Sequence, residues 1–177
     1  KVIKNIRFVD EFWALIPARS GSKKIKNKNI YRINGIPLVI HSLVFASRIK
    51  NIKKIIFSSD SSKYLKLASK LKKISKHKRK HKAANDNSTD LEVFKDFLEY
   101  HLKSSSILPK YFIYLRPTSP IRKTKTVIKA IKTFNKVSNK YSSLCSVNLM
   151  SETAFKSTII INKKLYGAYK KVSLDSL

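Results

Sequence analysis

Small and cationic residues follow an apolar run near the start of the chain, and together they could bind a polyanion. The run Phe12–Ile16 ends at Pro17, which is typical of a short buried strand that enters a loop. Gly21, between two serines, allows a tight turn whose backbone N–H groups point at one spot. No acidic residue between Glu11 and Asp60 neutralises the cations of this loop. These cations are Arg19, Lys23, Lys24, Lys26 and Lys28. The pattern predicts a site for a nucleoside triphosphate.

A second candidate binding turn, Arg116–Arg122, follows the apolar run Tyr111–Leu115. Its two prolines make the turn rigid at the carboxyl end of a predicted strand. The turn would present the hydroxyls of Thr118 and Ser119 and two guanidinium groups, which can bind a carboxylate bidentately. Alone it is weak evidence, because a solvent-exposed Pro-rich turn has the same sequence. Together with the Arg19 loop, it indicates a two-part binding site.

Alternating strands and helices must position these two turns. We expect strands at Phe12–Ile16, Lys54–Asp60, Tyr111–Leu115 and Ser143–Val147, and helices at Pro37–Ile49, Ser62–Leu71 and Thr89–Leu102 and from Thr124. This order predicts right-handed crossovers and a parallel sheet, in which a ligand lies beyond the carboxyl ends of the strands. The Arg19 loop and the Ser58-Ser59-Asp60 turn both fall at that edge. Asp60 could touch a nucleotide, but we favour a helix-capping role for it.

Helical spacing predicts which side chains face the core. Thr89 and Glu92 form a capping box. The residues expected to face inward are Leu91, Phe94, Leu98 and Leu102 in this helix, and Val127, Ile131 and Phe134 in the next. The acidic residues of the Thr89 helix suit its dipole and need no catalytic task. Cys145, in an apolar run, is expected to be a packed core thiol.

Length and composition indicate one globular domain without a membrane span. The chain has 177 residues, 42% of them hydrophobic, and no apolar run approaches the roughly 20 residues of a span. Its net charge of +29 comes almost entirely from lysines spread over every expected element. A selected nucleic-acid surface would use more arginine, so we expect only non-specific binding to nucleic acid. One cysteine and the absence of a signal-peptide core favour the cytoplasm.

The motifs resemble those of the CMP-sialic acid synthetases, the acylneuraminate cytidylyltransferases. In that family a strand leads into Ala-Arg-x-x-Ser-Lys, then a Lys-Asn pair and Gly-x-Pro-Leu. The corresponding residues are Ala18–Lys23, Lys28-Asn29 and Gly35–Leu38. The family also has Ser-Thr-Asp where this chain has Ser58–Asp60, and Gln-Pro-Thr-Ser-Pro-Leu-Arg where it has Arg116–Arg122.

The resemblance implies a fold and an assembly. The fold would be α/β, a three-layer Rossmann-like nucleotidyltransferase (GT-A-like) fold with a mostly parallel central sheet. Residues 1–177 would form one cytidylyltransferase domain without the family's C-terminal part, and 149–177 would begin the excursion that makes a homodimer. Ser157–Leu165 resembles the strand and turn of that excursion. Met150 and Phe155 could lie in the interface or in the core.

The resemblance also assigns roles to residues. Arg19, Lys23 and Lys28 would be catalytic, and Ser22, Asn29, Arg79 and Ser88 would bind the nucleotide, with Asp86 holding the loop before Ser88. Arg116, Thr118, Ser119 and Arg122 would bind the sugar. CTP would be the substrate, and Mg²⁺ is expected, although the family's two metal-binding aspartates have no counterpart here. The magnesium ligands therefore cannot be identified in this chain. His77 and His81, four residues apart, could bind a metal if they lay on a helix, but the surrounding positive charge disfavours a cation there.

The implied reaction transfers CMP from CTP to an acidic nine-carbon sugar and releases pyrophosphate. One alternative is a CMP-KDO-type or other sugar nucleotidyltransferase, although Arg116-Pro117 stands where the KDO enzymes have Gly-Asp. Two further alternatives are a nucleotide-binding fragment without turnover and a basic nucleic-acid-binding module.

Overall fold

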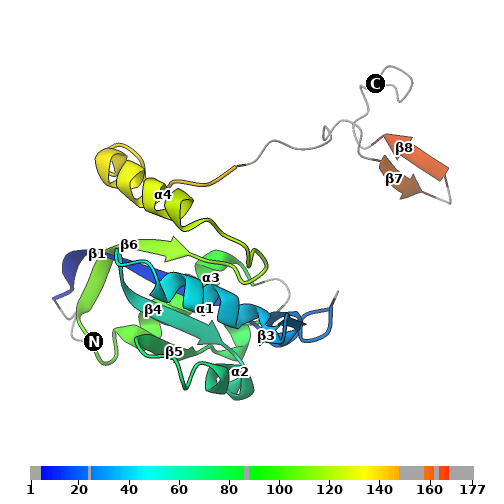
Figure 1. Ribbon diagram of the computed structural model, residues 1–177, viewed down its shortest axis with the longest axis horizontal. Coiled ribbons are helices and arrows are strands. Elements are labelled where there is room, and N and C mark those ends of the chain that lie inside the picture. Colours follow the sequence, from blue (N-terminus) through cyan, green and yellow to red (C-terminus); the bar gives the residue numbers. More distant parts are fainter. Residues whose placement is uncertain (1–4, 24, 86–87, 148–157, 162–163, 168–177) are drawn as a thin grey trace. The chain divides into compact units, whose positions relative to one another are not determined.

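A parallel sheet of four strands organises the larger part of the chain (Figure 1). The computed structural model describes residues 5–23, 25–85, 88–147, 158–161 and 164–167. These belong to two compact units, Lys1–Val137 and Ser138–Leu177. The strands of the first unit are β1 (Arg7–Pro17), β4 (Ile52–Ser59), β5 (Ile74–Lys78) and β6 (Ile107–Tyr114). Their order is β5-β4-β1-β6, and each neighbouring pair is parallel, which confirms the predicted α/β fold.

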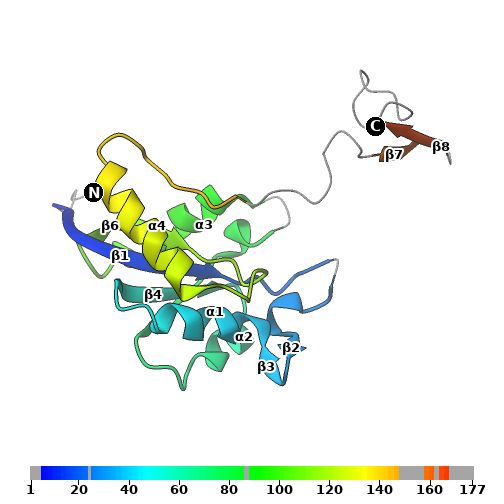
Figure 2. The same ribbon diagram turned by 45° about the horizontal axis from the view of Figure 1, so that its top comes forward.

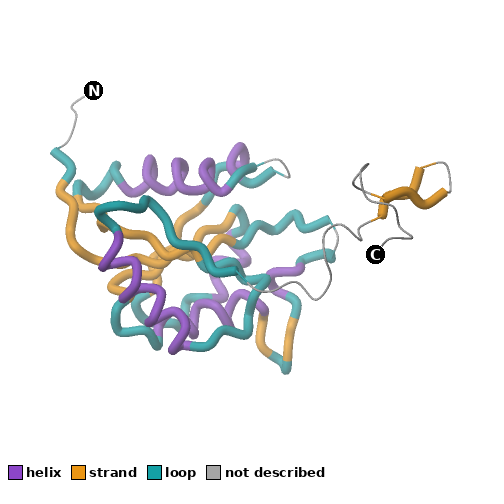
Figure 3. The backbone as a smooth tube through the Cα atoms, turned by 90° about the horizontal axis from the view of Figure 1, so that it is seen from above, coloured by secondary structure: helices purple, strands orange, loops and turns teal. Residues whose placement is uncertain are grey.

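Helices cover both faces of this sheet and complete the three layers (Figure 3). The helices are α1 (Leu38–Ser47), α2 (Ser62–Leu67), α3 (Asp90–His101) and α4 (Thr124–Val137). Side chains of α1, α2 and α4 pack with Ala14 and Ile16 of β1 on one face. Side chains of α3 pack with Trp13 and Leu15 on the other. An unbroken apolar run in β1 is therefore required, because both of its faces are buried.

A short hairpin leads from the loop after β1 into α1 (Figure 2). Its strands, β2 (Arg32–Ile33) and β3 (Ile36–Pro37), pair antiparallel around Asn34 and Gly35. Both turn residues have positive φ, 49° and 75°. This is the left-handed geometry that Asn-Gly favours in a two-residue hairpin turn. The hairpin fixes the direction in which α1 begins.

The edge strand β5 is missing from the sequence prediction. Its sequence, Ile-Ser-Lys-His-Lys, has too few apolar residues to indicate a strand. Charged side chains are common on edge strands because they discourage pairing with another chain. Only His77 of this strand is fully buried. The position of the strand therefore depends on the tertiary contacts of a polar residue, which the hydrophobic pattern of the sequence does not indicate.

The predicted inner face of α3 is wrong in part. The helix and its capping box at Thr89 and Glu92 are confirmed, but Leu91 is 61% exposed. The buried side chains are Val93, Asp96, Phe97 and His101, with Phe94 and Leu98 partly buried beside them. Two polar residues thus take positions that an apolar pattern would reserve for hydrophobic ones. For α4 the prediction holds, since Ile131 is buried and Val127 and Phe134 pack against the same core.

The second unit differs from the prediction in its first part. Ser143–Val147 is irregular instead of a strand, and Cys145 is exposed instead of packed. A strand needs a hydrogen-bonded partner. In the described part of this unit, β7 (Thr158–Ile161) and β8 (Lys164–Gly167) pair only with each other. The strand β7 agrees with the strand predicted within Ser157–Leu165, whereas the residues between β7 and β8, Met150 and Phe155 lie outside the described residues.

No helix in the described part of the chain is long and apolar enough to cross a bilayer.

Replacing the cap of α3 tests the local basis of the fold. Thr89→Ala removes the side chain that accepts a hydrogen bond from the backbone of Glu92. We expect a loss of about 1 kcal/mol in the free energy of unfolding, measured by urea denaturation. The control is Thr133→Ala at an exposed position within α4, which should cost nothing because alanine favours helix. Equal losses in the two variants would contradict the capping role.

Candidate active site

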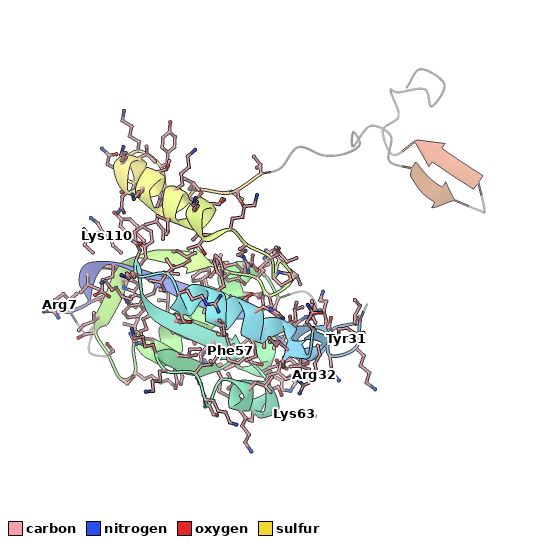
Figure 4. The ribbon with its side chains drawn as sticks, in the orientation of Figure 1. Arg7, Tyr31, Arg32, Phe57, Lys63 and Lys110 are labelled. Carbon is pink, nitrogen blue, oxygen red and sulfur yellow. The ribbon has the colours of Figure 1, made fainter. Side chains whose placement is uncertain are left out.

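The two predicted binding turns leave adjacent strands at the carboxyl edge of the sheet. In the strand order, β4 and β5 lie on one side of β1 and β6 lies on the other. The chain therefore changes direction between β1 and β6, and such a switch point is where open α/β sheets bind ligands. The N–H of Leu115 donates to the carbonyl of Leu15 at 3.0 Å, so the turns begin side by side. Tyr31 and Arg32 lie at this end of the molecule, opposite Arg7 and Lys110 (Figure 4).

Asp60 holds the loop after β1. Its two carboxylate oxygens accept hydrogen bonds from the backbone N–H of Ser20 at 2.8 Å and from the Ser20 hydroxyl at 2.5 Å. The expected capping role of Asp60 is wrong, because Ser61 is the residue before α2 and its hydroxyl accepts from the N–H of Tyr64. The carboxylate instead fixes the backbone of the cationic loop to the end of β4.

Asn29 holds the same loop from its other side. It is buried in the short 3₁₀ helix Lys28–Ile30, and its Nδ2 donates to the Arg19 carbonyl at 2.9 Å. Asn27, which precedes this helix with φ of 56°, accepts from the Tyr64 hydroxyl at 3.2 Å. The side chain predicted to bind nucleotide thus makes a contact that fixes the backbone of Arg19.

The cations of the loop differ in exposure. Arg19 and Lys28 are partly exposed and Lys23 is exposed, whereas Lys24 lies outside the described residues. Ser22 is partly exposed, and its N–H donates to the Ser20 carbonyl at 3.0 Å, which closes the turn. The Arg19 side chain is therefore presented from a loop that Asp60 and Asn29 fix at two points.

Arg79 extends from the end of β5 into the same edge and is only 5% exposed. Its Nε donates to the Ser58 hydroxyl at 3.2 Å and its Nη2 to the Ser58 carbonyl at 3.1 Å. A third bond joins Nη1 to the Ala83 carbonyl at 3.4 Å. Burial lowers the pKa of Arg79; Tyr114, Asp60 and Asp96 oppose this shift, and the charge of Arg19 adds to it.

Ser88 lies in the segment that follows. It is partly exposed, and its hydroxyl contacts the Lys82 carbonyl at 3.2 Å and Asn85 at 3.0 Å. These contacts order the loop before α3. Asp86, predicted to hold this loop, lies outside the described residues.

Asp90, at the start of α3, organises the second turn. Its carboxylate accepts a hydrogen bond from the Tyr114 hydroxyl at 2.8 Å and forms an ion pair with Arg116. Burial raises the pKa of Tyr114, and the hydrogen bond to Asp90 raises it further, so the phenol stays protonated. The Arg116 side chain is 63% exposed, and Thr118 and Ser119 are exposed as well.

Arg122 fixes the far end of the second turn to α1. Its Nη1 donates to the Ser42 hydroxyl at 3.1 Å, its Nη2 donates to the Arg116 carbonyl, and its guanidinium lies 5.9 Å from the Phe45 ring centroid. The structure thus uses this guanidinium to brace the turn. Of the four residues predicted to bind sugar, Arg116, Thr118 and Ser119 are the ones presented to solvent.

A buried polar cluster beneath the edge is absent from the sequence prediction. His77 contacts the Ser58 hydroxyl through Nδ1 at 3.0 Å and Asp96 through Nε2 at 3.3 Å. The three residues come from β4, β5 and α3, so no spacing in the sequence brings them together. His81 is exposed in the next turn, Lys80–Ala84, and does not share a helix face with His77.

The described residues do not fit a magnesium site. They contain no group of three side chains of the metal-binding types. At the binding edge, both oxygens of Asp60 are bonded to Ser20, and Asp90 is bonded to Tyr114 and Arg116. A cation would have to displace these partners, so no step of the chemistry below is assigned to a metal.

A parallel sheet with a cationic loop at its switch point is an arrangement that many nucleotide-binding α/β proteins share. The chain belongs to the cytidylyltransferase family, whose family model matches residues 13–166.

Two relatives illustrate this membership. The chain is 34% identical to post-translational flagellin modification protein B of Campylobacter coli, over 71% of this chain and 54% of that protein. It is 31% identical to the CMP-N,N'-diacetyllegionaminic acid synthase of Legionella pneumophila, over 78% of this chain and 58% of that protein. The chain therefore spans little more than half the length of these relatives.

The structure is similar to that of a CMP:2-keto-3-deoxy-manno-octonic acid synthetase complexed with CTP, with a TM-score of 0.55. That match has 16% identity and covers 72% of this chain and 48% of the other. At this identity, the likeness supports the fold alone.

The buried histidine predicts a pH dependence of stability. Burial lowers the pKa of His77 from 6.5 to about 4, against the opposing effect of Asp96. As pH falls, His77 is therefore protonated in the unfolded chain before it is protonated in the folded protein. The contribution of neutral His77 to the free energy of unfolding is full above pH 6.5 and is lost as pH falls towards 4. We expect the unfolding free energy of the wild type, relative to His77→Asn, to fall by about 3 kcal/mol over this range. Urea titrations at several pH values measure it, and a constant difference would contradict the prediction.

Proposed function

We propose that the protein transfers CMP from CTP to the anomeric hydroxyl of an acidic, sialic-type nine-carbon sugar and releases pyrophosphate. Membership of the cytidylyltransferase family supports the transfer, and relatives named for CMP-linked acidic sugars support the class of acceptor. The proposal rests mainly on the place in the sheet from which the two turns start. The Arg19 loop and the Arg116 turn leave neighbouring strands, one with clustered cations and one with an exposed guanidinium and hydroxyls.

The loop after β1 would bind the triphosphate. The sugar's anomeric oxygen forms a bond to the α-phosphorus, the bond from that phosphorus to the bridging oxygen breaks, and the electron pair leaves with pyrophosphate. The hydroxyl proton passes to solvent. Arg19, Lys23 and Lys28 would neutralise the charge that moves onto pyrophosphate, and one such pair at about 4 Å is worth ~4 kcal/mol at an effective dielectric constant of 20. Positioning and neutralisation supply most of the catalysis in this kind of transfer.

The turn after β6 would bind the sugar. Arg116 can offer its guanidinium to the sugar's carboxylate, since an exposed ion pair such as that with Asp90 is weak, about 0–1 kcal/mol. Thr118 and Ser119 would offer hydroxyls to the ring. Arg122 braces this turn from α1. Residues 149–177 are proposed to contribute to a homodimer, as the family resemblance implies.

Nucleotide selectivity separates this proposal from a basic nucleic-acid-binding module. By isothermal titration calorimetry at moderate salt, we expect the chain to bind CTP and to discriminate against ATP. Equal affinities for the two nucleotides, falling by orders of magnitude as salt rises, would instead indicate non-specific polyanion binding. Pyrophosphate release with CTP and a panel of nonulosonic acids then tests turnover and identifies the acceptor.

Removing the guanidinium of Arg19 tests its catalytic role. We expect Arg19→Ala to lower the rate of pyrophosphate release at least ~100-fold, because a preorganised donor to the moving charge is lost. The fold should persist, since Arg19 is not a core residue. The matched control is Arg48→Ala, an exposed arginine at the end of α1, at the opposite edge of the sheet. Wild-type turnover in Arg19→Ala would remove this residue from the mechanism.

A further inference from the structure

Ser58 is the meeting point of three groups at the binding edge. Its carbonyl accepts from the N–H of Ala18, at the start of the cationic loop, at 2.9 Å and from Nη2 of Arg79 at 3.1 Å. Its hydroxyl contacts Nε of Arg79 at 3.2 Å and Nδ1 of His77 at 3.0 Å. The hydroxyl therefore lies between a buried guanidinium and a buried imidazole, and both contacts have to be satisfied at once.

The chemistry of these groups fixes the direction of each hydrogen bond. A guanidinium can only donate, so the Ser58 hydroxyl accepts from Arg79. The Ser58 oxygen has a second lone pair, so the bond from Arg79 does not by itself decide the direction of the contact with His77. The Asp96 carboxylate decides it, because a ring lone pair beside that negative charge is disfavoured, and Nδ1 is therefore the unprotonated nitrogen that accepts from Ser58. The ring proton is left on Nε2, which lies 3.3 Å from the Asp96 carboxylate; the attraction there is electrostatic, because Nε2 makes no hydrogen bond to the described residues. Asp96 is itself held by the N–H of Lys80 at 3.0 Å, so the chain of contacts is anchored on α3.

No substrate reaches this chain of contacts, although it contains a serine, a histidine and an aspartate. Ser58 and His77 have no exposed surface and Asp96 is 6% exposed. The cluster is thus a support for the residue at its end, Arg79.

We propose that His77, acting through the Ser58 hydroxyl, is a positioning residue that sets the orientation of Arg79 for binding the nucleotide. This inference rests on the proposed function, in which Arg79 binds CTP. With its tautomer fixed by Asp96, the imidazole requires the hydroxyl proton to point towards His77. The hydroxyl lone pairs then face Arg79, which holds the guanidinium in one orientation at the rim of the site.

Two substitutions of His77 separate positioning from packing. The side-chain oxygen of Asn can take the place of Nδ1 and accept from Ser58, whereas Gln reaches the place of Nε2 and loses that contact. We expect His77→Gln to weaken CTP binding about tenfold, and His77→Asn to weaken it by about threefold or less. Calorimetry with CTP is carried out well below the melting temperature of each variant, and near-ultraviolet circular dichroism confirms that each one is folded.

The control is His101→Gln, which changes a buried histidine of α3 that contacts the Ile107 carbonyl at 2.9 Å away from Arg79. It should lose stability but keep its affinity for CTP. Equal losses of affinity in the two His77 variants, or the same loss in His101→Gln, would overturn the inference and leave the proposed function intact. A wild-type chain that does not bind CTP would overturn both.

A double-mutant cycle tests the same link without altering the imidazole. Ser58→Ala removes the hydroxyl but keeps the carbonyl that holds Ala18, and Arg79→Lys keeps a charge without the planar fork. Each change should weaken CTP binding about tenfold, and the double variant should be no weaker than Arg79→Lys alone. Additive losses, or an unchanged affinity in Arg79→Lys, would overturn the inference.

Discussion

The end of β4 is the feature on which the binding edge depends. Ser58 and Asp60 there bond to the backbone of the loop after β1, at Ala18 and Ser20. A loop that carries several cations repels itself, and such a loop keeps a defined conformation only if its backbone is fixed from outside. A carboxylate that accepts two hydrogen bonds from one serine does this, and also places one negative charge under the cations.

Burying Arg79 and His77 beneath this edge has a cost that the structure offsets by pairing. A buried guanidinium without partners would lose several kcal/mol of hydration. Here two oxygens of Ser58 and the Ala83 carbonyl accept from the guanidinium, and Nδ1 of His77 contacts the Ser58 hydroxyl. Nε2 of His77 lies 3.3 Å from Asp96 without a hydrogen bond among the described residues. Buried polar contacts of this kind make the atoms that they join rigid. The network therefore favours one arrangement of the edge over many.

The elements that could be predicted from the sequence are those indicated by residues that are close to one another along the chain. Apolar runs indicated β1, β4 and β6, and Thr89 with Glu92 indicated the start of α3. Non-local polar contacts have no such signal. The edge strand β5 is held in part by one buried histidine. Asp60 accepts a hydrogen bond from the N–H of Ser20, which lies forty residues earlier in the chain. For the same reason, Arg79 and Asn29 were predicted as nucleotide ligands, whereas the bonds that they make within the protein could not be predicted.

The distribution of acidic residues explains how a chain with a net charge of +29 can keep a defined site. Four acidic residues each make a specific contact at or beneath the binding edge. Asp60 contacts Ser20, Asp90 contacts Tyr114 and Arg116, Glu92 contacts the N–H of Thr89, and Asp96 contacts His77. Four of only ten acids thus fix backbone and side-chain geometry there. The surrounding field stays positive despite these carboxylates, because the chain has 39 lysines and arginines against ten acidic residues. Such a field raises the local concentration of a polyanion, while the engaged acids hold in place the loop that would bind it.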